Sequence, residues 1–196
     1  MGDKIAKPVM FWIPGDCFLY GSERDDRELL DFLKHGANIE IYVLEFNRRS
    51  WEESVETILD ILRDLNLSFF LGGVDSGAMI AHEIANRLKK PAFLFSPVLK
   101  PFNRHDSLHE TEKVDQLLYF KSLKNMKKIQ DEILPPNSSR EIVSTNYNDS
   151  VYSVLEDWIN ISDKISVQIL YNCENIRKFP PFQTCLACVQ KLAKNC

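Results

Sequence analysis

The chain has 196 residues, of which 44% are hydrophobic and 27% are charged, and its formal net charge is −4. This length and balance predict one globular domain over residues 1–196. The net negative charge argues against a general nucleic-acid binder, and no apolar run reaches the ~20 residues that a membrane-spanning helix needs. Without a separate signal-peptide segment, we expect a cytoplasmic protein with neither a nucleic-acid nor a membrane partner.

Predicted strands and helices alternate over the first hundred residues. The apolar run 9–13 is typical of a buried strand, and Pro14-Gly15 ends it in a tight turn. Apolar spacing predicts a helix in each interval between strands, and Ser50 with Glu53 matches the capping box that starts one of them. The expected strands are 9–13, 39–46, 67–71 and 92–95, and the expected helices are 24–35, 51–62 and 76–88. Such alternation is typical of a parallel sheet with helices on both faces.

The pattern changes after Leu99. We interpret about 100–163 as a lid-like insertion between two sheet strands, with helices expected over 105–132 and 151–159. A strand over 165–171 and a last helix after Pro180-Pro181 complete the chain.

Residues 73–77, Gly-Val-Asp-Ser-Gly, match a nucleophile elbow, the sharp strand-to-helix turn that raises one side chain above a sheet edge. The turn requires small residues two positions before and two positions after the nucleophile. A motif centred on Asp75 places Gly73 and Gly77 there, whereas one centred on Ser76 places Val74 there, which fits badly. The spacing therefore favours Asp75.

An aspartate at this position has several possible roles. Its attack on an acyl group gives a mixed anhydride, and its attack on an alkyl carbon gives an alkyl-enzyme ester. Asp75 can also act as a general base. The competing structural interpretation is that Asp75 only N-caps its helix.

Three segments, 11–15 (FWIPG), 73–78 (GVDSGA) and 81–85 (AHEIA), resemble the opening half of type II thioesterases. These are α/β-hydrolases that work beside polyketide and nonribosomal peptide synthases, and 90–97 also fits their next strand. The resemblance covers roughly residues 8–100. It implies an α/β-hydrolase fold, activity on substrates linked to an acyl carrier protein or coenzyme A, and no cofactor. It also implies an oxyanion hole formed by the Ser76 N–H and the backbone of Asp16 or Cys17.

The chain departs from that family at two points. The family's nucleophile is usually serine, occasionally cysteine, and its catalytic histidine lies on a loop near the C-terminus. No histidine follows residue 109 here, so we expect a shortened C-terminus without that strand and loop. The four histidines of the chain are His35, His82, His105 and His109.

Each histidine has a predicted role. His82 lies two turns beyond Asp75 on one helix, about 10 Å away, so we expect it to pack in the core. His35 is expected to interact with a helix C-terminus. His105 and His109 are spaced i and i+4, so they share a helix face. They are candidate acid/base partners of Asp75, or metal ligands together with Asp106. The alternative is that they only lie at the solvated start of a helix. Of these, we do not predict a metal site.

Asp16 approaches Asp75 if the first loop folds over the elbow as the resemblance implies. Two carboxylates in one small site would raise the pKa of one of them, and an ionised one would oppose oxyanion binding. In the alternative, Asp16 turns toward solvent.

The five cysteines are an odd number and suggest free thiols. Cys185 and Cys188 have the spacing of a zinc or redox pair, but Cys196 alone cannot supply the two further ligands that zinc needs. We expect both to pack against the sheet as small apolar residues.

Two functions compete on these observations. The first is a thioesterase-like hydrolase with Asp75 as nucleophile or base. The second is a non-catalytic binding or interaction module that kept the fold. Fold alone does not choose between them, and the glycines retained around Asp75 favour the enzyme.

Overall fold

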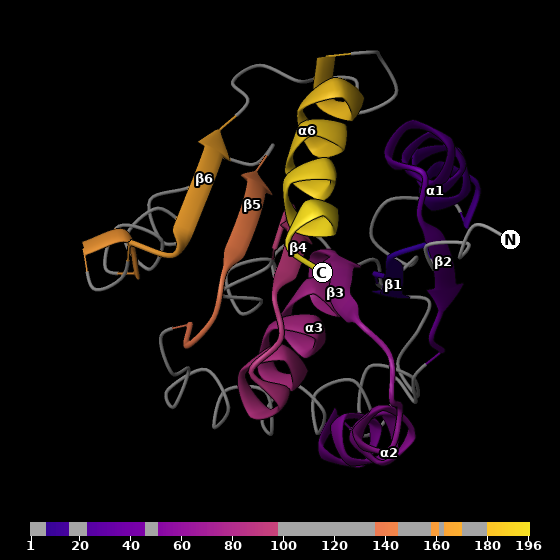
Figure 1. Ribbon diagram of the computed structural model, residues 1–196, viewed down its shortest axis with the longest axis vertical. Coiled ribbons are helices and arrows are strands. Elements are labelled where there is room, and N and C mark those ends of the chain that lie inside the picture. Colours follow the sequence, from indigo (N-terminus) through magenta and orange to yellow (C-terminus); the bar gives the residue numbers. More distant parts are fainter. Residues whose placement is uncertain are drawn as a thin grey trace, which may run out of the picture.

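The computed structural model describes residues 7–15, 23–45, 51–97, 136–144, 158–160, 163–169 and 180–196. Six parallel strands form one sheet in the order β2-β1-β3-β4-β5-β6. They are β1 (Val9–Ile13), β2 (Glu40–Val43), β3 (Phe69–Val74), β4 (Ala92–Phe95), β5 (Arg140–Ser144) and β6 (Ile165–Ile169). The helices in the described residues are α1 (Glu23–Ala37), α2 (Trp51–Arg63), α3 (Asp75–Leu88) and α6 (Pro180–Lys194). The predicted parallel sheet with flanking helices is confirmed (Figure 1).

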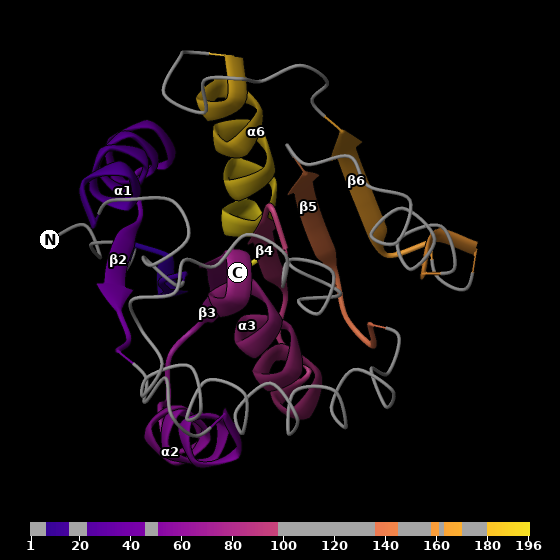
Figure 2. The same cartoon turned by 180° about the vertical axis from the view of Figure 1, so that it is seen from behind.

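The helices divide between the two faces of the sheet. Side chains alternate across a strand, so Met10 and Trp12 of β1 face the apolar cluster that includes α1 and α6, while Phe11 and Ile13 face the cluster that includes α2 and α3. Accordingly, α6 lies in front of the sheet in Figure 1, and α3 lies in front of it in Figure 2. Each large apolar side chain buried in this way contributes roughly 1.5–3 kcal/mol.

The structure corrects the extent of the lid-like insertion predicted over 100–163. β5 lies inside that range and pairs with β4 on one flank and with β6 on the other. The prediction was wrong over these residues because the strand begins with two charged residues, Arg140 and Glu141, which are both buried. The helix predicted over 105–132 lies outside the described residues.

The other predicted elements are found close to their expected bounds. β1 and β4 match theirs, and β3 extends to Val74, directly against the start of α3. Of the helix predicted over 151–159, only its last two residues are described, and they are helical. None of the helices in the described part of the chain combines the length and apolar character that a membrane span requires.

Candidate active site at the carboxyl edge of the sheet

The strand order changes direction at β1, and this places the candidate site. From β1 the chain passes to β2 on one side, and it then returns to β3 on the other side of β1. In open parallel sheets, ligands bind beyond the carboxyl ends of the strands at such a switch point. Pro14 and Gly15 follow β1, and Asp75 follows β3. Both predicted site segments therefore begin at the switch point.

The turn between β3 and α3 has the tightness of a nucleophile elbow, because the strand passes into the helix without an intervening loop. A Cβ added to Gly73 would lie 2.6 Å from the carbonyl oxygen of Gly77. A Cβ added to Gly77 would lie 2.3 Å from the carbonyl oxygens of both Ile13 and Pro14. All of these atoms are backbone, so neither position has room for a side chain, and the two glycines flank Asp75 as the motif requires.

Asp75 is the first residue of α3 and not its N-cap. The N-cap is Val74, whose backbone is extended with φ −125° and ψ 147° and which makes no side-chain cap hydrogen bond. The competing interpretation of Asp75 as an N-cap residue was therefore wrong. The first four N–H groups of a helix have no partner within the helix, and those of Asp75 and Ser76 are among them. The helix dipole favours negative charge at the same place.

The described residues contain only part of the predicted site. The backbones of Asp75 and Ser76 are described, at the start of α3. Asp16, Cys17, His105 and His109 lie outside the described residues. The contact between Gly77 and Pro14 nevertheless brings the start of the first loop against the first turn of α3. Residues 170–179, between β6 and α6, also lie outside them and contain no histidine.

His82 is a core residue, as predicted. Its exposed fraction is 2%, and its ring stacks on Trp158 with centroids 4.5 Å apart and planes inclined by 15°. Its Nδ1 accepts a hydrogen bond from Nε of Arg140 at 3.3 Å. His82 is therefore held in the core by Arg140 and Trp158, away from the elbow.

Arg140 is a fully buried cation whose hydrogen bonds go to neutral acceptors. It donates to Oδ1 of Asn86 at 2.7 Å, to the carbonyl oxygen of Lys90 at 3.1 Å and to Oγ of Ser138 at 2.7 Å. Burial lowers the pKa of Arg140 to about 10. The guanidinium lies near the C-terminal end of α3, whose carbonyl groups and dipole favour a positive charge. This network therefore fixes β5 against α3 at the amino edge of the sheet, opposite the elbow.

His35 also lies away from the elbow. It is exposed in the last turn of α1, and α1 ends just before the start of β2. The starts of parallel strands share one edge, so His35 lies toward the amino edge of the sheet. Of the four histidines, both of those that the structure describes are therefore remote from Asp75.

Ser96 is a candidate that the sequence analysis missed. It follows β4, which pairs with β3 up to Val74, and it is buried with a positive φ of 43°. A left-handed backbone is uncommon outside glycine and often marks a functional site. The only local signal in the sequence is the Ser96-Pro97 pair after an apolar run. Its position puts Ser96 beside the elbow.

Cys185 and Cys188 pack against the sheet, as predicted. Both thiols are buried in the cluster that includes α1 and α6. Burial raises the pKa of Cys185, and burial together with the charge of Glu141 raises that of Cys188 to about 12. Glu141 also pairs with Nζ of Lys191 at 2.5 Å. Thiols held protonated in this way are poor metal ligands and weak nucleophiles. Among the described residues, no three His, Cys, Asp or Glu side chains gather in a possible metal site.

Comparison with solved structures identifies the architecture. Carboxyl esterase 2 from the mycorrhizal fungus Tuber melanosporum matches with a TM-score of 0.67 and 14% identity over 96% of this chain and 77% of its own. A structure from work on the metagenome-derived lipolytic enzymes LipS and LipT matches with a TM-score of 0.68 and 12% identity, over 95% of this chain and 94% of its own. An esterase of the bacterial hormone-sensitive lipase family matches with a TM-score of 0.67 and 13% identity, over 96% of this chain and 77% of its own.

No protein-family model matches the chain, and no curated protein matches it. At these identities the structural likeness shows the fold, which is that of the α/β-hydrolases.

Proposed function

We propose that the chain is a thioesterase-like hydrolase that cleaves acyl groups from coenzyme A or an acyl carrier protein, with Asp75 as its nucleophile. The observation that carries the proposal is the elbow itself. Gly73 and Gly77 lie against backbone atoms on either side of Asp75, as the glycines of a nucleophile elbow do, which supports Asp75 as the nucleophile. The structural neighbours include esterases and lipolytic enzymes, which supports ester or thioester cleavage.

An aspartate nucleophile suits a site with few histidines. A serine hydroxyl must lose a proton to a base before it attacks. An aspartate side chain is ordinarily ionised at neutral pH and needs no such base. His35 and His82 lie away from the elbow, so the first step would proceed without either of them.

The reaction has two steps. A carboxylate oxygen of Asp75 attacks the thioester carbonyl carbon, the C–S bond breaks, and the thiolate leaves and takes a proton from solvent. Water then attacks the mixed anhydride, releases the fatty or other acyl acid, and regenerates the Asp75 carboxylate. His105 or His109 is the candidate base for the water in the second step.

The oxyanion of each tetrahedral intermediate would be bound by backbone donors. The Ser76 N–H lies in the first turn of α3, where N–H groups have no partner within the helix. The backbone of Asp16 or Cys17 is the proposed second donor, since Pro14 already lies against Gly77. The Asp16 side chain would have to point away from this hole, because an ionised carboxylate there repels the oxyanion.

The decisive experiment compares Asp75→Asn with a matched control, Asp64→Asn, at an exposed carboxylate beyond the end of α2. The amide is nearly isosteric with the carboxylate but is not nucleophilic. We expect Asp75→Asn to lower turnover of acyl-coenzyme A, acyl carrier protein or simple ester substrates by about 100-fold or more. Asp64→Asn should leave turnover unchanged. Full activity in Asp75→Asn would remove Asp75 from the mechanism.

Trapping the intermediate tests the covalent step directly. Hydroxylamine added during turnover should leave a hydroxamate on the Asp75 side chain, a product that its direct attack on the thioester substrate does not give, and mass spectrometry of a quenched reaction should find the acyl mass on the peptide that carries Asp75. If turnover proceeds and neither species forms, Asp75 acts as a base on water instead.

The second candidate function is a non-catalytic binding module with this fold. It is favoured by the absence of any histidine after residue 109. Wild-type protein that turns over none of the three substrate classes, yet binds an acyl carrier protein, would support this function over the first.

A further inference from the structure

The outer edge of β2, a short strand that begins with the charged Glu40, has no neighbouring strand among the described residues. In the described residues β2 pairs only with β1 (Figure 1). The side chains of Tyr42 and Val43 are 55% and 52% exposed. Natural edges are commonly blocked by lysine, proline or a bulge. Residues 41–43, Ile-Tyr-Val, contain no charged residue and no proline.

The hydrogen-bond pattern shows which backbone groups face outward. The N–H of Glu40 donates to the Pro8 carbonyl at 3.0 Å, and that of Leu44 donates to the Trp12 carbonyl at 2.8 Å. Backbone direction alternates along a strand, so the even-numbered residues of β2 bond to β1. The N–H and C=O groups of Ile41 and Val43 therefore point away from the sheet.

We propose that β2 pairs with β2 of a second copy of this chain, antiparallel and about a two-fold axis at Tyr42. In this register Ile41 of each copy lies opposite Val43 of the other, and the two pairs form four backbone hydrogen bonds. The two Tyr42 side chains face one another on the axis in a non-hydrogen-bonded pair, where side chains approach closely.

The side chains around the axis are complementary in this arrangement. The ring of Tyr42 already packs on Phe11, with centroids 5.8 Å apart, so the two copies bring four aromatic rings into one row. Glu40 lies opposite Leu44 of the second copy, so like charges do not meet. The Glu40 carboxylate is already paired with Lys7 at 3.7 Å and with Lys34 at 3.6 Å.

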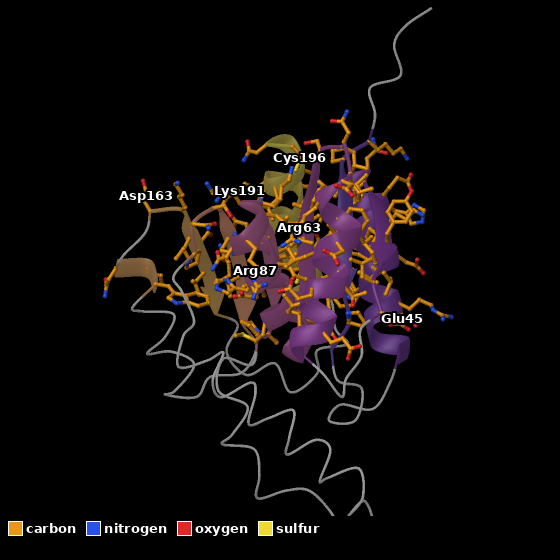
Figure 3. All side chains as sticks on the ribbon, turned by 90° about the horizontal axis from the view of Figure 1, so that it is seen from below. Glu45, Arg63, Arg87, Asp163, Lys191 and Cys196 are labelled. Carbon is orange, nitrogen blue, oxygen red and sulfur yellow. The ribbon has the colours of Figure 1, made fainter. Side chains whose placement is uncertain are left out.

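The opposite edge of the sheet, at β6, takes no part in such a dimer. Glu45, just beyond β2, and Asp163, just before β6, lie at opposite ends of the sheet (Figure 3). The elbow lies at the carboxyl edge and is not covered by the pairing. Strand pairing over so few residues buries less than the ~1,200 Å² of a stable interface, so the dimer is expected to be weak, with dissociation in the micromolar range.

A charge-exchange experiment tests the self-pairing. Sedimentation equilibrium of the wild type from about 1 to 300 µM should show a monomer–dimer equilibrium. Tyr42→Lys and Tyr42→Glu should each weaken association about tenfold or more, because each places like charges opposite one another. A mixture of the two variants should restore association, as a heterodimer, which also shows that both variants are folded. Ile61→Lys, on α2 and equally exposed at 52%, should behave as the wild type.

Two results would overturn the proposal. One is a wild type that stays monomeric throughout this concentration range. The other is dimerisation of Tyr42→Lys alone with the wild-type affinity, which would place the interface elsewhere. Tyr42→Cys gives the geometric check: oxidation should link position 42 of one copy to position 42 of the other, since opposed residues in such pairs suit a disulfide.

Discussion

Replacing Gly77 by alanine tests the packing of the elbow, because two physical effects change the free energy of unfolding in opposite directions. Gly77 is in the first turn of α3, where alanine is the better helix former by about 1 kcal/mol. Helix propensity alone therefore predicts a more stable protein. The close approach to β1 predicts a less stable one.

The size of the second effect follows from the contacts. The new Cβ would lie 2.3 Å from two carbonyl oxygens and 2.7 Å from the Pro14 carbonyl carbon. An ordinary contact needs about 1 Å more, and Ile13 is a fully buried residue of a strand that is paired on both sides. Overpacking of this kind costs about 3 kcal/mol, at the upper end of its usual range. Because the gain in helix propensity offsets part of this cost, we expect Gly77→Ala to lower the free energy of unfolding by about 2 kcal/mol.

Urea denaturation measures this loss, with Gly36→Ala as the matched control. Gly36 is also helical, and its added Cβ would lie 2.7 Å from a methyl group of Leu186, which is the end of a flexible side chain. That variant should lie within about 1 kcal/mol of the wild type, since side-chain movement offsets the contact. A Gly77→Ala protein as stable as Gly36→Ala would refute the close packing of the elbow against β1.

The other predictions concern the buried polar groups. Arg140→Met should lower the free energy of unfolding, measured by urea denaturation, by about 3–5 kcal/mol, because it removes the hydrogen-bond donors to Asn86 and to the Lys90 carbonyl. The control, Arg63→Met at an exposed position, should lower it by less than about 1 kcal/mol. Cys188 has a pKa of about 12 in the folded chain, against 9.0 for an ordinary thiol. Its contribution to stability should therefore be complete below about pH 9 and fall as the pH rises toward about 12; a pH slope of stability unchanged in Cys188→Ala would contradict this. Metal analysis of protein purified without chelator should find well under one zinc per chain, and stoichiometric zinc lost in Cys185→Ser would overturn that expectation.

The sequence predicted the elbow because its cause is local. Two glycines at fixed spacing around Asp75, between an apolar run and a helix pattern, permit few other turns. The contacts of Gly73 and Gly77 with backbone atoms show why no larger residue serves there. β1, β3 and β4 were predicted for a similar reason, since each is a short apolar run ended by a turn residue, whereas β2 was predicted from the alternation of its apolar and polar residues.

β5 was missed because its support is not local. Its first two residues are charged, and their burial depends on groups far away in the chain: Asn86 and Lys90 accept from Arg140, and Lys191 pairs with Glu141. The sequence of a five-residue strand does not contain these partners. Ser96 was missed likewise, because a positive φ at a serine is fixed by the surrounding sheet and not by the residue itself.

Packing explains the glycines of the elbow but not the residue between them. Gly73 and Gly77 would be needed for stability whether or not the chain is an enzyme, since the backbone contacts exist in either case. At the first position of a helix an acid is worth at most about 1 kcal/mol through the dipole, and many residues are tolerated there. Asp75→Asn therefore separates the two functions where the glycine variants do not. A small change in stability with complete loss of turnover assigns the carboxylate to chemistry. The same small change in stability with no activity in either protein assigns the Asp75 carboxylate to the helix dipole, and the tight shape of the turn to folding alone.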